Sequence, residues 1–382
     1  MRLEATRVWT KPILVAMSHA IERFALAVEP EDPLVVVALF QRLSYFEREV
    51  EVYRRIAARA ALTVVGVTED FPPGLAPGVS HVRLDPDESL AGEWSVTALG
   101  PRTGATLVAR DLETVTPAAA TLESGRQFSG GWSFRRELAY TELLRLRDQL
   151  GDRLDPAQLG VLDQVLTRVL ATPGVAAEAQ LADALGFTAD LVEAGEQRGD
   201  HYLRELDRIQ GRGRDPQTGL RTPGFLAHYS TGSGPGTLPV GMLLIRLHAL
   251  AGLRPAHGAR AELAVLQSLA RTLAAPLAAC DMVVRTRPDE FLILLPGHRG
   301  DTVIRIHRQL TAAIAALGRS YPFVPLPALF AATVTRTRPL PVNELAAALD
   351  ETTDPDPDTG AATAGEADGV PHSGSLVFLA GP

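Results

Sequence analysis

The chain has 382 residues, a formal net charge of −8 and a pI near 5.7. It is too long for one ordinary domain of roughly 100–200 residues, so two domains are expected. The acidity argues against a general nucleic-acid binder, because neutralising phosphates requires Lys and Arg clustered on one face.

Hydrophobic residues make up 46% of the chain and charged residues 21%, which is the composition of a folded globular protein. Cys280 is the only cysteine, so a disulfide framework and a thiolate metal cluster are excluded and a reducing compartment is expected. The N-terminus lacks the long apolar stretch and the cleavage site of a signal peptide. No window approaches ~18 uninterrupted apolar residues, so we expect a cytoplasmic protein without a membrane partner.

The first 150 residues alternate between strand and helix patterns. The apolar run at 34–39 predicts a buried strand, and apolar residues at helical spacing over 43–56 predict an amphipathic helix after it. Residues 71–78 are rich in Pro and Gly and predict a loop. Further strands are expected at 61–67, 81–84, 94–99 and 105–110. An α/β domain over 1–150 follows.

Residues 151–214 carry helical patterns only and are expected to form a helical connector. Asp155 and Pro156 suit the N-cap and the first position of a helix. Leu159, Leu162, Leu166 and Val169 lie on one face of that helix, which either its own domains or a second chain must cover. We favour the second chain, which predicts a homodimer.

A second connector helix is expected at 189–210. The stretch 177–197 has the rhythm of a helix-turn-helix, but the expected recognition helix at 189–195 carries no basic residue, so DNA binding is not predicted.

From residue 215 onward an α/β pattern returns. Residues 350–374 are acidic, rich in Gly, Thr and Pro, and lack aromatics, which predicts a disordered insertion. The expected elements are strands at 240–247, 282–286, 291–295 and 375–380 and helices at 259–275 and 301–317.

Two motifs in this half stand about seventy residues apart: DPQTGL at 215–220 and RTRPDEFLILLPG at 285–297. They resemble the DxLTGL opening and the RxGGDEF hairpin of the GGDEF family, the fold of diguanylate cyclases. With the closing strand the resemblance covers 215–382. It implies an α/β domain around a central, mostly antiparallel sheet.

The first half contains Phe40-Gln41, Tyr53, Glu93-Trp94 and the stretch RQFSGGWSF at 126–134, in that order. This pattern is similar to the DICT sensory domain, which commonly accompanies GGDEF domains. Glu93, Trp94 and Trp132 are therefore candidates for a sensory pocket. The alternative is that these aromatics are core residues, as buried aromatics usually are.

A diguanylate cyclase joins two GTP molecules and holds Mg²⁺ through carboxylates, because Mg²⁺ requires hard oxygen ligands. The resemblance places one of these carboxylates at Arg246 and the other at Asp289. Arg287 and Pro288 replace the glycines that let the hairpin approach phosphates, while Glu290 and Phe291 keep the signature. The metal site is therefore expected to be lost.

Other positions implied by the resemblance have also changed. The guanine-reading positions fall at Arg254 and Leu263, and the phosphate-holding Lys falls near Thr353. The inhibitory product site reads Ala278 and Asp281, so its arginine is missing. Arg246, Arg254 and Arg287 either form a basic pocket for a phosphate-bearing ligand or are solvated.

We therefore expect a non-catalytic cytoplasmic signalling protein, in which a sensory domain is coupled to a degenerate GGDEF domain that acts by protein contact or nucleotide binding. The alternative is an active diguanylate cyclase with displaced metal ligands, the one case that needs Mg²⁺. The nine histidines show no metal-ligand spacing, so no metal site and no cofactor is predicted. Expected partners are a second copy of the chain, a signalling protein and a nucleotide.

Overall fold

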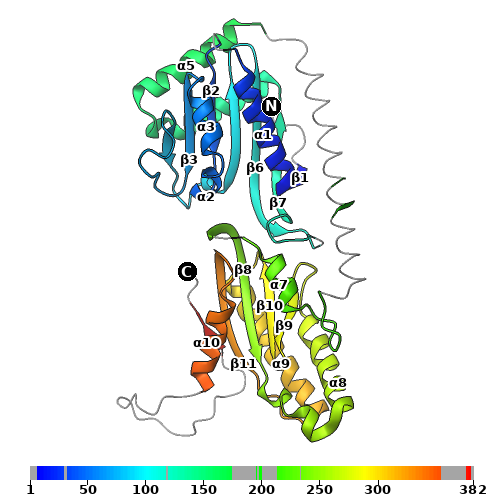
Figure 1. Ribbon diagram of the computed structural model, residues 1–382. Coiled ribbons are helices and arrows are strands. Elements are labelled where there is room, and N and C mark those ends of the chain that lie inside the picture. Colours follow the sequence, from blue (N-terminus) through cyan, green and yellow to red (C-terminus); the bar gives the residue numbers. More distant parts are fainter. Residues whose placement is uncertain are drawn as a thin grey trace, which may run out of the picture. The chain divides into compact units, whose positions relative to one another are not determined.

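The computed structural model describes residues 7–29, 32–117, 119–173, 195, 198–199, 213–232, 234–353 and 376–379. The chain divides into two compact units (Figure 1): unit 1 comprises Met1–Glu113 and Arg126–Gly199, and unit 2 comprises Thr114–Gly125 and Asp200–Pro382. Each unit contains helices and its own sheet, which confirms the expected α/β class. The helix-turn-helix rhythm and most of the predicted helix at 189–210 fall outside the described residues.

Unit 1 is built on a seven-stranded sheet with the order β1-β7-β6-β5-β2-β3-β4. Strands β2, β3 and β4 are parallel, whereas β5 runs antiparallel to both β2 and β6. The strands are β1 (Arg7–Thr10), β2 (Val35–Leu39), β3 (Leu62–Val67), β4 (Ser80–Arg83), β5 (Glu93–Leu99), β6 (Gly104–Val115) and β7 (Arg126–Ser133).

Helices cover both faces of this sheet, because strand side chains alternate between the faces. Val36 and Ala38 of β2 pack with α1 and α3, whereas Val35 and Val37 pack with α4 and α5. The apolar segment 43–56 forms two helices rather than the single predicted one. The helices are α1 (Lys11–Ala27), α2 (Leu43–Phe46), α3 (Val50–Ala57), α4 (Arg136–Leu150) and α5 (Pro156–Ala171).

Helix α5 begins where the sequence predicted, with Asp155 as N-cap. The Asp155 carboxylate accepts from the Gln158 backbone N–H at 2.8 Å, and the Gln158 side chain accepts in return from the Asp155 N–H at 3.0 Å. Leu162, Leu166 and Val169 are buried in the core of unit 1, so the stripe packs on its own domain and not on a second chain.

Gly130 lies where the backbone of β7 passes close to that of β6. A Cβ atom at this position would lie 2.1 Å from the Val108 carbonyl oxygen, so only glycine fits. At the next residue, Gly131, a Cβ atom would meet nothing within 4 Å. The two adjacent glycines therefore differ in what they do.

Unit 2 contains a five-stranded sheet with the order β12-β11-β8-β10-β9. Among the described strands of this sheet only β11 and β12 are parallel, as the expected mostly antiparallel sheet requires. Its elements are α7 (Pro223–Tyr229), β8 (Gly234–Arg246), α8 (Leu253–Ala274), β9 (Met282–Arg287), β10 (Glu290–Pro296), α9 (Gly300–Ser320), β11 (Leu329–Arg338), α10 (Val342–Thr353) and β12 (Leu376–Phe378).

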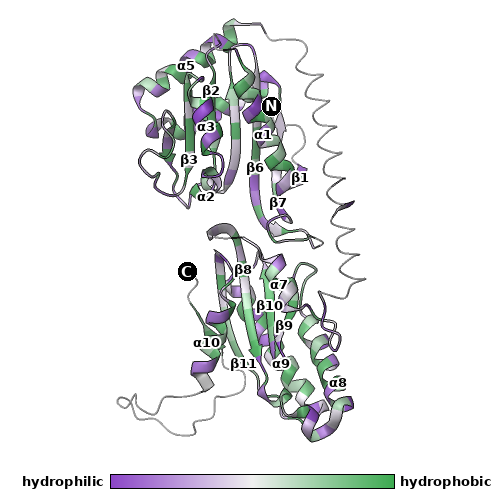
Figure 2. Ribbon diagram, in the orientation of Figure 1, coloured by the Kyte–Doolittle hydropathy of each residue, from purple (hydrophilic) through white to green (hydrophobic). Residues whose placement is uncertain are grey.

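Alternation along β8 again supplies two cores. Leu243 and Ile245 pack with α8 and α9, whereas Met242 and Leu244 pack with α7 and α10. Strand β10, between β8 and β9, begins with Glu290 and is otherwise hydrophobic (Figure 2). The polar residues at the ends of β8 and β10 are therefore the candidates for a functional site in this sheet.

Residues 114–125, the end of β6 and the segment that leads to β7, belong to unit 2. Val115 and Leu122 are buried in the core that also contains α7, and the Leu122 N–H donates to the Tyr229 carbonyl at 2.9 Å.

The first residues of the predicted disordered insertion are helical in the structure, which corrects the prediction. Residues 350–353 are the last residues of α10, and Asp350 forms an ion pair with Arg246. The remainder of the insertion, 354–374, lies outside the described residues, and within them no helix is long and apolar enough to cross a membrane.

Candidate functional site

Unit 1 contains a cavity of about 130 Å³ on the side of the sheet covered by α1. Its wall combines aromatic rings with cationic and anionic side chains. The lining residues are Lys11, Val15, Ser18, His19, Phe40, Gln41, Tyr45, Arg48, Glu49, Trp94, Arg126 and Phe128. This mixture suits a small ligand with polar groups.

Helix α1 supplies four of the lining residues, and the sequence analysis did not identify them. Ile13, Leu14, Met17 and Ile21 are buried against the sheet, which fixes how the helix lies. Its polar residues between them, including Ser18 and His19, are thereby held beside the cavity. The helical apolar period of residues 13–25 was the signal that could have placed them.

A buried arginine forms the cationic part of the wall. Arg126 is fully buried, forms an ion pair with Asp111, and donates from Nη1 to the Tyr45 hydroxyl at 3.0 Å. The Lys11 amine lies 4.9 Å from the centre of the Tyr45 ring. The Arg126 guanidinium also lies 5.0 Å from the centre of the Phe128 ring, so cation and aromatic groups alternate here.

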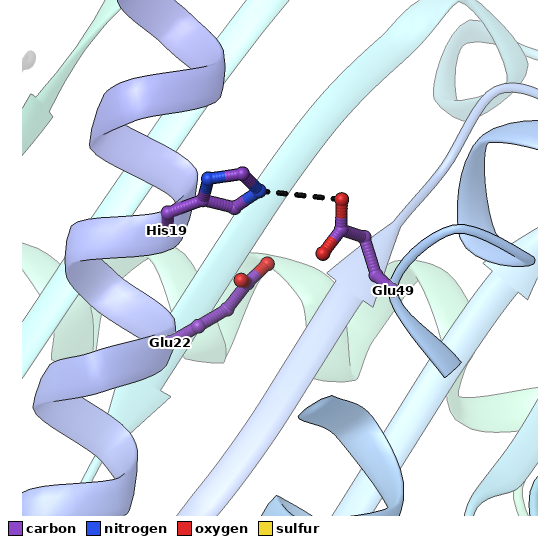
Figure 3. A group of neighbouring side chains, drawn as sticks. All are labelled: His19, Glu22 and Glu49. Carbon is purple, nitrogen blue, oxygen red and sulfur yellow. Dashed lines mark hydrogen bonds and ion pairs between the residues drawn. The ribbon is translucent and has the colours of Figure 1, made fainter. Parts of the chain in front are cut away.

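Three side chains gather beside the cavity, His19, Glu22 and Glu49, and two of them, His19 and Glu49, line it (Figure 3). The His19 Nε2 and Glu49 Oε1 atoms are 3.2 Å apart, and the Ser18 hydroxyl donates to Glu22 Oε1 at 3.2 Å. Burial and, next, the nearby Glu49 charge raise the pKa of Glu22 to about 7. The negative charges of Glu22 and Glu49 therefore repel each other.

The three residues proposed from the sequence for a sensory pocket, Glu93, Trp94 and Trp132, lie in different surroundings. Trp94 lines the cavity, and its buried Nε1 has no hydrogen-bond partner among the described residues. Glu93 is 2.6 Å from Arg145 in an ion pair, and Trp132 packs on Trp9 with ring centroids 4.4 Å apart. Of the three, only Trp94 is among the lining residues.

In unit 2 the position implied for a metal-binding carboxylate is occupied by a buried ion pair. Arg246 ends β8 and pairs in register with Glu290, the first residue of β10. Its Nη2 and Nε atoms donate to Glu290 Oε2 at 2.8 and 3.1 Å, and its Nη1 bonds Asp350. Although burial disfavours the cation, these carboxylates raise the pKa of Arg246, so the arginine stays charged.

The rest of the signature surrounds this pair. Asp289 Oδ2 lies 3.8 Å from His248 Nδ1, and Phe291 is a fully buried core residue. Arg287, the last residue of β9, and Pro288, in the turn that follows, are exposed. The surviving carboxylate thus faces an imidazole, while Glu290 beside it is bound by arginine.

Two further sequence candidates also have partners. Arg254 is exposed and lies 3.9 Å from the Glu262 carboxylate. Asp281 lies 3.2 Å from His298, accepts from the Ala278 N–H at 2.8 Å, and burial raises its pKa. Arg246 is therefore held in a buried ion pair, whereas Arg254 makes only a long, exposed contact with a carboxylate.

The two motifs that carry the C-terminal resemblance contact each other. Arg285 Nη1 is 3.0 Å from Asp215 Oδ2, and Asp215 also accepts from the Thr218 backbone N–H at 3.0 Å. Burial alone would raise the pKa of Asp215, but the hydrogen bonds from Thr218 and the Arg285 charge together hold it below its ordinary value. The opening motif is thereby fastened to the hairpin.

Comparison with known proteins finds that the first part of the chain matches the model of a described family. Residues 2–112 match the model of DICT, the sensory domain in diguanylate cyclases and two-component systems. The resemblance read from the first half of the sequence is thereby confirmed. No curated protein matches the chain.

Solved structures similar to the chain include the diguanylate cyclase SiaD with its activator SiaC from Pseudomonas aeruginosa, at 17% identity and a TM-score of 0.30 over 56% of this chain and 86% of that one. The GGDEF domain of DgcB from Caulobacter crescentus with c-di-GMP matches at 14% and 0.28, over 37% of this chain and 84% of that one. Vibrio cholerae LapD, S helix-GGDEF-EAL, matches at 17% and 0.30, over 39% of this chain and only 35% of LapD.

Proposed function

We propose that this protein is a non-catalytic cytoplasmic signalling protein. Its DICT domain senses a small ligand in the cavity of unit 1, and its GGDEF-type domain acts by contact with a partner protein or by binding a nucleotide. This domain does not join GTP molecules, because the positions that the family uses for metal and phosphate carry other groups.

The Arg246–Glu290 pair carries this proposal. Arg246 is 4% exposed and Glu290 is 2% exposed, so the guanidinium fills the position where the resemblance implies a Mg²⁺ ligand. A divalent cation placed beside Arg246 would be repelled by its positive charge. The Glu290 carboxylate is already bound to Arg246 and is not available as a metal ligand. Asp289 alone offers half of a metal site.

The sensory role is supported by the chemistry of the cavity. Aromatic rings of Phe40, Tyr45, Trp94 and Phe128 form its apolar surface, and charged groups stand at its wall. The unpaired Nε1 donor of Trp94 is the kind of buried group that a ligand acceptor would satisfy.

The test is a cyclase assay on the full chain with GTP and either Mg²⁺ or Mn²⁺, in which cyclic di-GMP is quantified against a protein-free blank. We expect no product above the blank, while an active diguanylate cyclase in the same buffer supplies the positive control. Product that disappears in the Asp289→Ala variant would establish the alternative, an active enzyme with displaced ligands, and would overturn the proposal.

We also propose that the protein forms a homodimer, as the resemblance to GGDEF proteins implies. Because the leucine stripe of α5 is covered within unit 1, the contact must use other residues. Light scattering at micromolar concentration tests this point, and a mass of one chain, 40.8 kDa, would contradict it.

A further inference from the structure

His19, Glu22 and Glu49 converge from two elements of unit 1 (Figure 3). His19 and Glu22 are three residues apart on α1 and therefore share a face of the helix. Glu49 is the N-cap residue of α3, which packs beside α1. One imidazole nitrogen and two carboxylates are a common set of ligands for transition metals.

The distances suit a metal ion. One ligand atom from each residue can be chosen so that all three lie within 4.8 Å of one another, and the His19–Glu49 pair is at 3.2 Å. Zinc binds nitrogen and oxygen ligands at about 2.0–2.2 Å, which places neighbouring ligands roughly 3.0–3.6 Å apart. The His19–Glu49 distance falls in this range, and the other ligand atoms must move closer for one metal ion to bind all three.

The surroundings of Glu22 supply a second observation. The Tyr53 side chain is fully buried, and its hydroxyl makes no well-aligned hydrogen bond among the described residues. Its interactions are with Glu22 and Glu49, so it stands next to the same group. A buried hydroxyl of this kind beside paired carboxylates can support a ligand as an outer-shell donor, the role that Ser18 already fills toward Glu22.

Electrostatics favours a cation at this place. Glu22 is 3% exposed, so its carboxylate and that of Glu49 repel each other with little screening by solvent. A divalent ion between them removes this repulsion and binds both groups. The imidazole favours a transition metal over Ca²⁺ or Mg²⁺, which prefer all-oxygen sites.

We propose that His19, Glu22 and Glu49 bind a divalent transition metal ion at the wall of the cavity in unit 1. With three protein ligands the metal keeps an open position, as in sites that bind an exchangeable fourth ligand. His19 and Glu49 both line the cavity, so this position faces its interior. The metal would define the ligand class of the proposed sensory cavity, and the assignment therefore rests on the proposed function.

The experiment uses the full chain after treatment with EDTA and its removal, titrated with Zn²⁺ in a calorimeter. We expect one site per chain, weakened roughly 10-fold or more in His19→Asn and in Glu49→Gln. Both side chains are partly exposed, so these variants should fold, and their circular dichroism spectra verify this. Glu47→Gln and His81→Asn, exposed in the same unit, are matched controls that should bind Zn²⁺ like the wild type.

A second readout is the visible absorption of Co²⁺, which changes when imidazole and carboxylate replace water as ligands. Absence of Zn²⁺ binding by the wild type, or binding that both site variants retain, would overturn the assignment. Because the proposed function is tested by the cyclase assay, the two can fail separately: cyclic di-GMP synthesis overturns that function whatever Zn²⁺ does.

Discussion

Arg246 and Glu290 face each other across neighbouring strands as a buried ion pair, with 2.8 Å between Nη2 and Oε2. The positive charge that Mg²⁺ would bring to this place, if the resemblance held there, is thus supplied by the Arg246 guanidinium. An arginine that is held this way serves the stability of unit 2, and this role can be measured.

Replacing Arg246 by methionine should cost about 3–5 kcal/mol of unfolding free energy, because it leaves the buried Glu290 carboxylate without its charged partner. The double variant Arg246→Met with Glu290→Met should recover most of this loss. Far-UV circular dichroism in a denaturant titration is the appropriate measurement, because Trp9, Trp94 and Trp132 all lie in unit 1. Asp350→Asn serves as a control that should change stability by less than about 1 kcal/mol, since the Asp350 side chain is 65% exposed. Equal losses in single and double variants would argue against this role.

Asp215→Asn should loosen the opening motif and cost about 1–3 kcal/mol at pH 7, because Asp215 accepts charge-assisted hydrogen bonds from Arg285 and Thr218. Since the folded-state pKa of Asp215 lies below 3.8, its ordinary value, this contribution is present above about pH 4 and is lost as the pH falls through the folded-state pKa. The difference between variant and wild type should therefore be constant from roughly pH 8 to 5 and shrink at lower pH. Asp289→Asn, whose carboxylate is 3.8 Å from His248, should have a smaller effect at pH 7.

Gly130→Ala should destabilise unit 1 by at least about 1–3 kcal/mol, because the added methyl group would collide with the backbone of β6. Gly131→Ala is the matched control, since a methyl group there meets open space. Tryptophan fluorescence follows unit 1 in this experiment. If both variants melt like the wild type, β7 does not approach β6 as described.

Leu162→Ala should cost about 2–5 kcal/mol and leave the oligomeric state unchanged, because Leu162 is 1% exposed in the core of unit 1. Leu170→Ala on the same helix should be nearly neutral, since Leu170 is 74% exposed. Light scattering of the folded variants gives the oligomeric state. A change of mass in Leu162→Ala without loss of stability would restore the stripe as a contact between chains.

Much of the fold followed from period and turn chemistry. Strands such as β2, with Val35, Val37 and Leu39 on one face, are continuous apolar runs whose length settles their type. The capping box at Asp155 is equally local. What covers the leucine stripe of α5 was not predictable, because an apolar face shows that it is buried but not which surface buries it.

The candidate site divides in the same way. The positions of Arg246 and Glu290 could be predicted from the sequence, because both residues lie at the ends of neighbouring strands whose register is fixed by their apolar faces. His19 and Glu49 are thirty residues apart, and only the packing of α1 beside α3 brings them to 3.2 Å. Such pairs carry no local pattern, which is why spacing alone indicated no metal ligands.

Residues 114–125 contribute Val115 and Leu122 to the core of unit 2, although the rest of β6 and all of β7 belong to unit 1. A gene fragment that starts at residue 213 would therefore encode a domain with an apolar gap next to α7. Such a fragment should be poorly expressed or aggregate unless those twelve residues are supplied in trans as a peptide or joined to it by a designed linker. Isolating unit 2 therefore requires joining two separate segments of the chain, because a single truncation removes part of its core.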